Sequence, residues 1–228
     1  MRHLIILTAA AIPYASEARA DALQQQVLAG ARAVPSDGYS FRRSLTIERT
    51  GAARKLLVER FDPRLPVASR WNLIAVDGRA PTVKEIEQSR KARRGDVPSY
   101  HQLARWFGAP ATRVDAAPGY ATYRFARLPK GVLKVGPVDP SEHLSVEASV
   151  NLKGSTPFVE RVRITSTKPF RIMMVASVKS MTITGRYRLG PDGRPVPADN
   201  ASDFAGSVFG KARTMRTRTT FDEMRAVR

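Results

Sequence analysis

The clearest pattern along the chain is a strict alternation of apolar and polar side chains in two segments, His143–Lys153 and Ser180–Leu189. The apolar members of the first segment are Leu144, Val146, Ala148, Val150 and Leu152. Side chains of a β-strand point alternately to the two faces of its sheet. A period of two residues therefore predicts strands that have one buried face and one solvent face, as in antiparallel sheets.

Looser alternation predicts seven further strands. They are Ser40–Thr50, Arg54–Asp62, Trp71–Asp77, Tyr120–Leu128, Phe158–Thr165, Phe170–Val178 and Val208–Phe221. Several are bounded by residues that favour turns, as at Thr50-Gly51, Asp77-Gly78 and the segment Pro191–Pro195. No internal repeat and no long linker divides this series.

Three helices are predicted among the strands. Asp21–Val34 has apolar residues at helical spacing. A second helix begins with Thr82 and Glu85, which are spaced as a capping box, and its body is polar and basic, so we expect it to be exposed. The third begins at Ser99, and its apolar face is formed by Leu103, Trp106 and Phe107.

These elements predict a mainly β (α+β) fold. A long antiparallel sheet with one apolar face must cover that face with other structure. We therefore expect a curled antiparallel sheet, or half-barrel, of about nine strands, in which the N-terminal helix and a two-helix insertion cover the concave face. A closed barrel and a sandwich of two sheets remain open at this stage.

The first twenty residues have the anatomy of a cleavable secretory signal. A basic start is followed by the apolar run Leu4–Ala15, and Ala18-Arg19-Ala20 offers small residues at the positions that a signal peptidase reads. A buried N-terminal helix is the alternative. We expect residues 1–20 to be removed, residues 21–228 to form one domain, the protein to be periplasmic, and the mature chain to have no transmembrane anchor.

Charge and composition restrict the partners. Without the first twenty residues, which contain Arg2, Glu17 and Arg19, the formal net charge falls from +18 to +17. Such an excess favours anionic lipid, lipopolysaccharide or acidic protein partners. Export argues against nucleic acid. The absence of cysteine excludes disulfides, thiol nucleophiles and thiolate metal sites.

The sequence contains no arrangement of residues that predicts catalysis, a metal site or a cofactor. Beyond the signal, the histidines are His101 and His143, which do not form a metal-binding motif. The segment Gly206–Gly210 surrounds Ser207 but lacks the spacing of a nucleophile elbow. We expect its glycines to let a strand bend. An enzyme acting through paired carboxylates remains a minor alternative.

Two sets of residues are candidates for binding. An apolar pocket would use Trp71, Leu103, Trp106, Phe107, Tyr123, Phe125, Phe158, Met174 and Tyr187, although such residues also form ordinary cores. An anionic surface would be met by Arg90, Lys91, Arg93, Arg94, Lys211, Arg213, Arg216 and Arg218. Basic residues that protect strand edges would give the second pattern as well.

The layout resembles the periplasmic lipoprotein carriers and the outer-membrane lipoprotein-sorting group. The resemblance is carried by the N-terminal helix before Phe41–Leu45, by Trp71–Gly78 leading to Pro81-Thr82, and by the helical insertion that follows. It implies an open half-barrel closed by helices, which shields an acyl chain or other apolar cargo. Lipid or a lipidated protein would then be the partner.

The chain also departs from that group. The receptor-type members are lipidated on cysteine, which this chain lacks. The carriers use an arginine near the first strands to couple cargo to lid opening. Arg42 and Arg43 lie in this region, but the register does not decide between them, and neither is assigned a role.

Two hypotheses therefore remain. In the first, the protein holds an apolar or lipidic ligand between a curved sheet and a helical lid. In the second, it is a non-enzymatic envelope protein with a filled core, whose basic faces contact anionic lipid, lipopolysaccharide or an acidic protein. A continuous apolar cavity between sheet and helices would favour the first, and a solid core the second.

Overall fold

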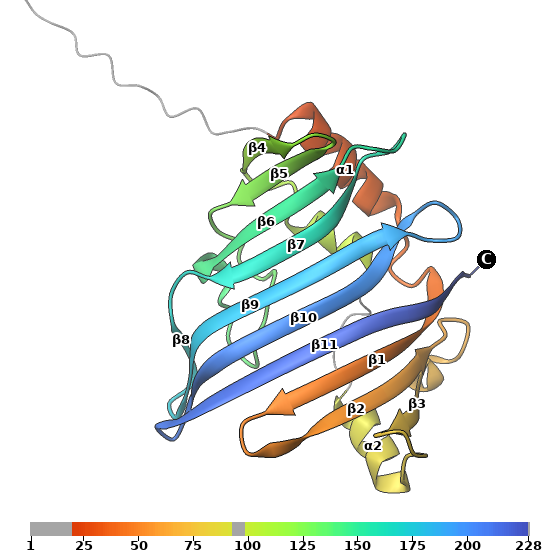
Figure 1. The fold of residues 1–228 in the computed structure, drawn as a ribbon, viewed down its shortest axis with the longest axis vertical. Coiled ribbons are helices and arrows are strands. Elements are labelled where there is room, and N and C mark those ends of the chain that lie inside the picture. The colour runs from red at the N-terminus through yellow and green to blue at the C-terminus, as the bar shows by residue number, and fades with distance from the viewer. Residues whose placement is uncertain (1–19, 93–98, 228) are drawn as a thin grey trace, which may run out of the picture.

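A computed structural model describes residues 20–92 and 99–227. Its main feature is one large antiparallel sheet with helices on one face (Figure 1). The strands are β1 (Tyr39–Arg49), β2 (Ala52–Phe61), β3 (Trp71–Val76), β4 (Thr112–Ala117), β5 (Tyr120–Phe125), β6 (Leu144–Asn151), β7 (Phe158–Ser166), β8 (Phe170–Met173), β9 (Ala176–Leu189), β10 (Pro195–Val208) and β11 (Lys211–Ala226).

The strands are ordered β3-β2-β1-β11-β10-β9-β7-β6-β5-β4, and the short β8 pairs with β9. The first and last strands therefore pair in the middle of the sheet. The helical elements are α1 (Ala22–Ala33), η1 (Val67–Ser69), α2 (Val83–Ala92), η2 (Tyr100–Arg105) and η3 (Ser141–His143). Strands β3 and β4 are the two edges, so the sheet is not closed.

The prediction of a mainly β fold with an unclosed antiparallel sheet is confirmed. The sheet has eleven strands instead of about nine, because β4 and β10 were not predicted. The predicted strand Val208–Phe221 begins too early, since Val208 ends β10 and Phe209-Gly210 form the turn before β11. The third predicted helix is a 3₁₀ helix, η2, as is usual for such a short helical segment.

Strand register places residues of neighbouring strands, most of them apolar, in rows across the face that the helices cover. One row runs from Tyr123 through Ala148 and Val162 to Gly185 and Asn200. The residues of β6 with even numbers from 144 to 150 are at most 1% exposed, as their alternation predicts. Thus the buried face of β6 is the helix-covered face of the sheet.

Helices α1 and η2 are fixed to each other by specific contacts. The Gln24 side chain, 2% exposed, donates hydrogen bonds from Nε2 to the carbonyl oxygens of Phe107 (2.6 Å) and Ala109 (2.8 Å). A Cβ atom at Gly108 would lie 2.9 Å from Leu28 Cδ2, so glycine permits this close approach. The two helices therefore cover the sheet as one unit.

Helix α2 lies against the other end of the sheet, near β2 and β3 (Figure 1). Its predicted capping box is present, because the Thr82 N–H donates to Glu85 Oε2 at 2.9 Å and the Glu85 N–H to Thr82 Oγ1 at 3.3 Å. Hydrogen bonds from the Arg79 guanidinium and from the Thr82 N–H to the carboxylate lower the pKa of Glu85 to about 2. Among the described residues, no helix is long and apolar enough to cross a membrane.

Candidate functional site: a groove between sheet and helix

A groove of about 600 Å³ lies between η2 and the inner face of strands β7, β9, β10 and β11. Its apolar lining consists of Leu103, Trp106, Val132, Leu133, Val162, Ile164, Ile183, Tyr187, Pro197 and Phe221. The loop between β5 and η3 supplies residues 131–134. The groove is thus walled on one side by the sheet and on the other by a short helix and a loop.

Gly185 lies in the floor of this groove. It stands in the long strand β9, between Val162 and Asn200 of the neighbouring strands, which also line the groove. A Cβ atom built on Gly185 would have a single neighbour within 4 Å, Tyr187 Cε2 at 4.0 Å. Glycine within a strand is unfavourable, and it often marks a close approach by a ligand or another chain segment. The missing side chain keeps this part of the groove free of protein atoms.

Aromatic contacts hold the helical wall of the groove. Tyr100 and Tyr187 meet edge to face with ring centroids 5.1 Å apart, and Trp106 and Phe125 do so at 5.2 Å. Tyr100 is 1% exposed, and its hydroxyl accepts a hydrogen bond from the Val159 N–H at 2.8 Å. Burial raises the pKa of Tyr187 to about 12, so this phenol is neutral at physiological pH.

The nine apolar residues singled out from the sequence do not form one site. Leu103, Trp106 and Tyr187 line the groove. Phe107, Tyr123, Phe125 and Phe158 are buried in the filled core beside it. Met174 differs from expectation, because it lies in the turn between β8 and β9, where its side chain is 95% exposed.

Trp71 does not line the groove and packs against the same hydrophobic core. It packs against Phe41 and Phe61, and the Arg43 guanidinium lies 4.0 Å from the centre of its ring. Arg43 forms an ion pair of 2.6 Å with Glu59, which is 3% exposed. Arg42, by contrast, contacts Glu223 at 3.5 Å on the solvent side.

The loop side of the groove carries positive charge. Arg105 Nη2 donates to the carbonyl oxygen of Gly131 at 3.2 Å, which ties η2 to the loop. Lys134 is exposed and lines the groove, and it has no ion-pair partner among the described residues. An anionic group at this rim would therefore meet a cation.

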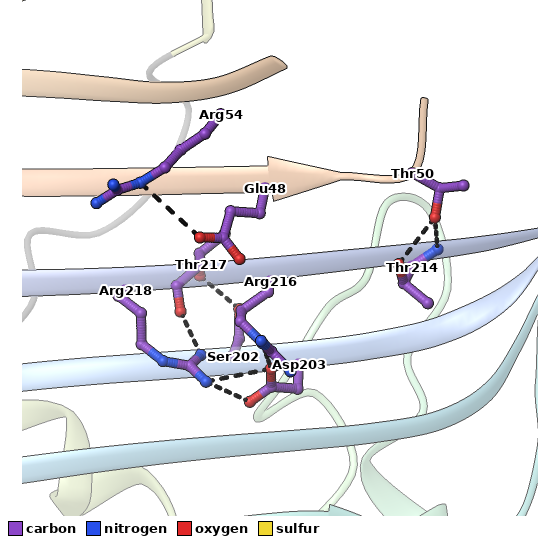
Figure 2. Close-up of polar contacts among 9 residues, drawn as sticks. All are labelled: Glu48, Thr50, Arg54, Ser202, Asp203, Thr214, Arg216, Thr217 and Arg218. Carbon is purple, nitrogen blue, oxygen red and sulfur yellow. Dashed lines mark hydrogen bonds and ion pairs between the residues drawn. The ribbon is translucent and has the colours of Figure 1, made fainter. Parts of the chain in front are cut away.

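The basic residues singled out from the sequence fall into three sets. Figure 2 shows Arg216 and Arg218 converging on Asp203, at 2.7 Å and 3.1 Å. Lys211 and Arg213 are exposed and form no ion pair within the described ranges. Arg90 and Lys91 are exposed on α2, while Arg93 and Arg94 lie outside the described residues.

The remaining residues that were considered for catalysis or metal binding, in the segment Gly206–Gly210 and at His101, have structural contacts. Gly206 lies at a register shift between β10 and β9. A Cβ atom there would clash with the carbonyl oxygen of Ser177, so glycine is required for the pairing of these two strands. The His101 ring nitrogen Nδ1 contacts the Val34 carbonyl oxygen at 3.1 Å. In the described part of the chain, no three potential metal ligands come together.

Pocket residues that the sequence did not reveal come from η2 and its N-cap, from β7, β9, β10 and β11, and from the loop at 131–134. Ile183 and Gly185 share the alternating face of Ser180–Leu189, so the period of two did place them on the inner face. The pattern gave no sign that this part of the face is left uncovered. Val132 and Leu133 stand in a loop between turn residues, where no periodic signal exists.

Comparisons with known proteins add one similarity in fold. No protein-family model matches the chain, and no curated protein matches it. The crystal structure of the LolA superfamily protein NE2245 from Nitrosomonas europaea aligns with 92% of this chain and 94% of its own, with 11% sequence identity and a TM-score of 0.35. The similarity to that structure is one of overall architecture and does not extend to sequence.

Proposed function

We propose that this protein binds an apolar or lipidic ligand in the groove between η2 and the curved sheet. The observation that carries the proposal is the groove itself, about 600 Å³ in volume and floored by Gly185, in which ten apolar residues stand beside seven polar or charged ones. Binding sites for small ligands are concave, mostly apolar and about 300–1,000 Å³ in volume. The rest of the space between helices and sheet is filled by side chains.

The position of the groove argues against a purely structural role for this end of the sheet. A scaffold gains stability when its helix packs on the sheet without a void, because each void forfeits dispersion contacts. Here Ile164 and Ile183 face the groove and are only partly buried by other side chains. An apolar ligand would complete this packing.

The charge at the rim refines the class of ligand. Lys134 and Arg105 lie at the loop side of the groove, and Val162, Ile164 and Ile183 line it on the sheet side. An amphiphile with an acyl chain and an anionic head would satisfy both regions. A free fatty acid, an anionic lipid and an acylated protein share this chemistry.

The site of action that we propose is the periplasm. Support comes from residues 1–20, which have the pattern of a cleavable secretory signal. Residues 1–19 lie outside the described residues. Secretion of a variant that lacks residues 1–20 would contradict this assignment. Cleavage after Ala20, found by N-terminal sequencing of the secreted protein, would support it.

Native mass spectrometry and ligand uptake test the proposal together. Protein purified without detergent should carry a lipid-sized adduct, and the delipidated protein should take up a fluorescent fatty acid with saturable kinetics. A clean apo mass together with no uptake would overturn the proposal. Competition by unlabelled fatty acid, lysophospholipid and an acylated peptide would then rank the three sources of the acyl chain.

A further inference from the structure

Two hairpin turns meet at one end of the sheet and expose apolar side chains. Met174-Val175 form the turn between β8 and β9, and Phe209-Gly210 form the turn between β10 and β11 (Figure 1, lower left). The Phe209 N–H donates to the Val175 carbonyl oxygen at 2.8 Å. We name these residues the apolar tip: Met174 (95% exposed), Val175 (41%), Val208 (40%) and Phe209 (73%).

Phe209 is a poor choice for the turn in which it stands. Phe209 and Gly210 both have positive φ, 50° and 73°, as in the two-residue turn that favours Asn-Gly. A Cβ atom is disfavoured in this left-handed region. An exposed phenylalanine at this position therefore helps neither the turn nor the core, and its side chain is available to a partner.

The chain segments that form the apolar tip and its immediate flanks are basic. Segments 168–180 and 204–213 contain no aspartate or glutamate and five lysines and arginines. Arg171, Lys179, Lys211 and Arg213 are all exposed and form no ion pair among the residues that the structure describes. In Figure 2 the acid nearest along β10, Asp203, is already engaged by Arg216 and Arg218.

We propose that the apolar tip docks on a membrane surface rich in anionic lipid. Phe209 and Met174 would enter the boundary between headgroups and acyl chains, and the four surrounding basic side chains would contact lipid phosphates. Weak apolar insertion and electrostatic attraction reinforce each other in peripheral binding. This surface is separate from the groove, so the inference does not rest on the ligand proposal.

Vesicle flotation with the full-length mature protein tests the docking surface. We expect binding to vesicles of phosphatidylcholine with about one third phosphatidylglycerol, little binding to pure phosphatidylcholine, and loss of binding in high salt, since screening weakens contacts to phosphates. Phe209→Asn should lower the affinity about tenfold, in line with the loss of one apolar anchor, while the melting temperature stays equal or rises. Lys211→Glu/Arg213→Glu should lower it more than tenfold.

Two matched controls separate the tip from general charge and apolarity. Val67→Ser removes a side chain that is 79% exposed elsewhere on the molecule, and Arg90→Glu/Lys91→Glu makes the same change in charge on α2. Both should leave binding within twofold of wild type. Equal losses in the control and tip variants, binding that ignores salt, or no binding to anionic vesicles would each overturn the proposal. Tight binding to an acidic protein without vesicle binding would do the same.

Discussion

Gly185→Ile is the substitution that fills the groove most directly. The new Cβ atom would lie 4.0 Å from Tyr187 Cε2, an ordinary van der Waals distance, and has no other neighbour within 4 Å. The strand geometry at Gly185 suits a β-branched residue, because its φ is not positive. The added branches would extend from the floor of β9 into the space assigned to the ligand.

The expected effect on stability is a gain. Replacing glycine within a strand by a β-branched residue is worth about 1 kcal/mol, and burying about half of an isoleucine side chain adds about 1 kcal/mol. A domain of this size gains roughly 2–4 °C in melting temperature per kcal/mol. We therefore expect a rise of about 4–8 °C in a thermal melt of the delipidated protein.

The expected effect on binding is a loss. The isoleucine displaces part of the ligand from the groove. A loss of about 1.4 kcal/mol in binding free energy corresponds to a tenfold higher dissociation constant. Titration with a fluorescent fatty acid measures the dissociation constant. Thr184→Ile is the matched control, because Thr184 is next to Gly185 in the strand and its side chain points to the opposite face of the sheet. The affinity of this variant for the fatty acid should equal that of the wild type. Unchanged uptake by a folded Gly185→Ile protein would refute the assignment of the groove.

The remaining predictions concern the contacts that hold the fold around the groove. Arg43→Ala should lower the free energy of unfolding by about 1–3 kcal/mol, because it removes a charge-assisted contact of 2.6 Å with the buried Glu59 carboxylate; a urea midpoint within error of wild type would contradict this. Tyr100→Phe removes the hydroxyl that accepts the buried Val159 N–H, and we expect a cost of about 1–3 kcal/mol in the same assay, whereas a neutral result would mean that water replaces the hydroxyl. Asp21→Ala should cost about 1 kcal/mol at pH 7, since this carboxylate caps α1. Although desolvation opposes the shift, hydrogen bonds from Tyr123 and Gln24 and the charge of Arg113 lower the pKa of Asp21. The charge-dependent part of this stabilisation is therefore present above the ordinary aspartate pKa of about 3.9 and is lost as the pH falls through the lowered folded value. Thermal melts at pH 7 and pH 2.5 should show a smaller difference between wild type and variant at the lower pH, and an equal difference at both would contradict the account.

The elements that the sequence predicted well are those in which the pattern and the packing agree. Strand β6 alternates without a break, and its apolar residues are buried on one face. Helix α1 follows its apolar spacing and is capped by Asp21, whose Oδ1 accepts the Gln24 N–H at 2.7 Å. In both cases one side of the element is buried by tertiary structure, so the period is visible in the sequence.

Strand β10 was missed for an equally physical reason. It contains Pro195, Pro197 and Gly206 together with several small and acidic residues, which are depleted in strands. It is held between β9 and β11, and most of its residues are only half-buried. Pairing with the long strands β9 and β11 stabilises β10 although its own residues have low strand propensity.

The groove could be predicted only in part. Apolar residues on β9 and η2 pointed to the inner face, but a void depends on which side chains fail to meet across it. The sequence was equally uninformative about Met174. Its apolar character suggested a pocket residue, but it lies in a two-residue turn, where its side chain is exposed. Burial in such cases depends on tertiary contacts that composition does not encode.

Photo-crosslinking tests the central claim most directly. The mature protein would be loaded with a fatty acid that carries a diazirine near the end of its chain, irradiated, and digested for peptide mass spectrometry. The account predicts adducts on peptides containing Leu133, Ile183 and Trp106, and their loss in Gly185→Ile. Adducts confined to the peptides of the apolar tip, or spread evenly over the surface, would contradict a ligand bound between the helix and the sheet.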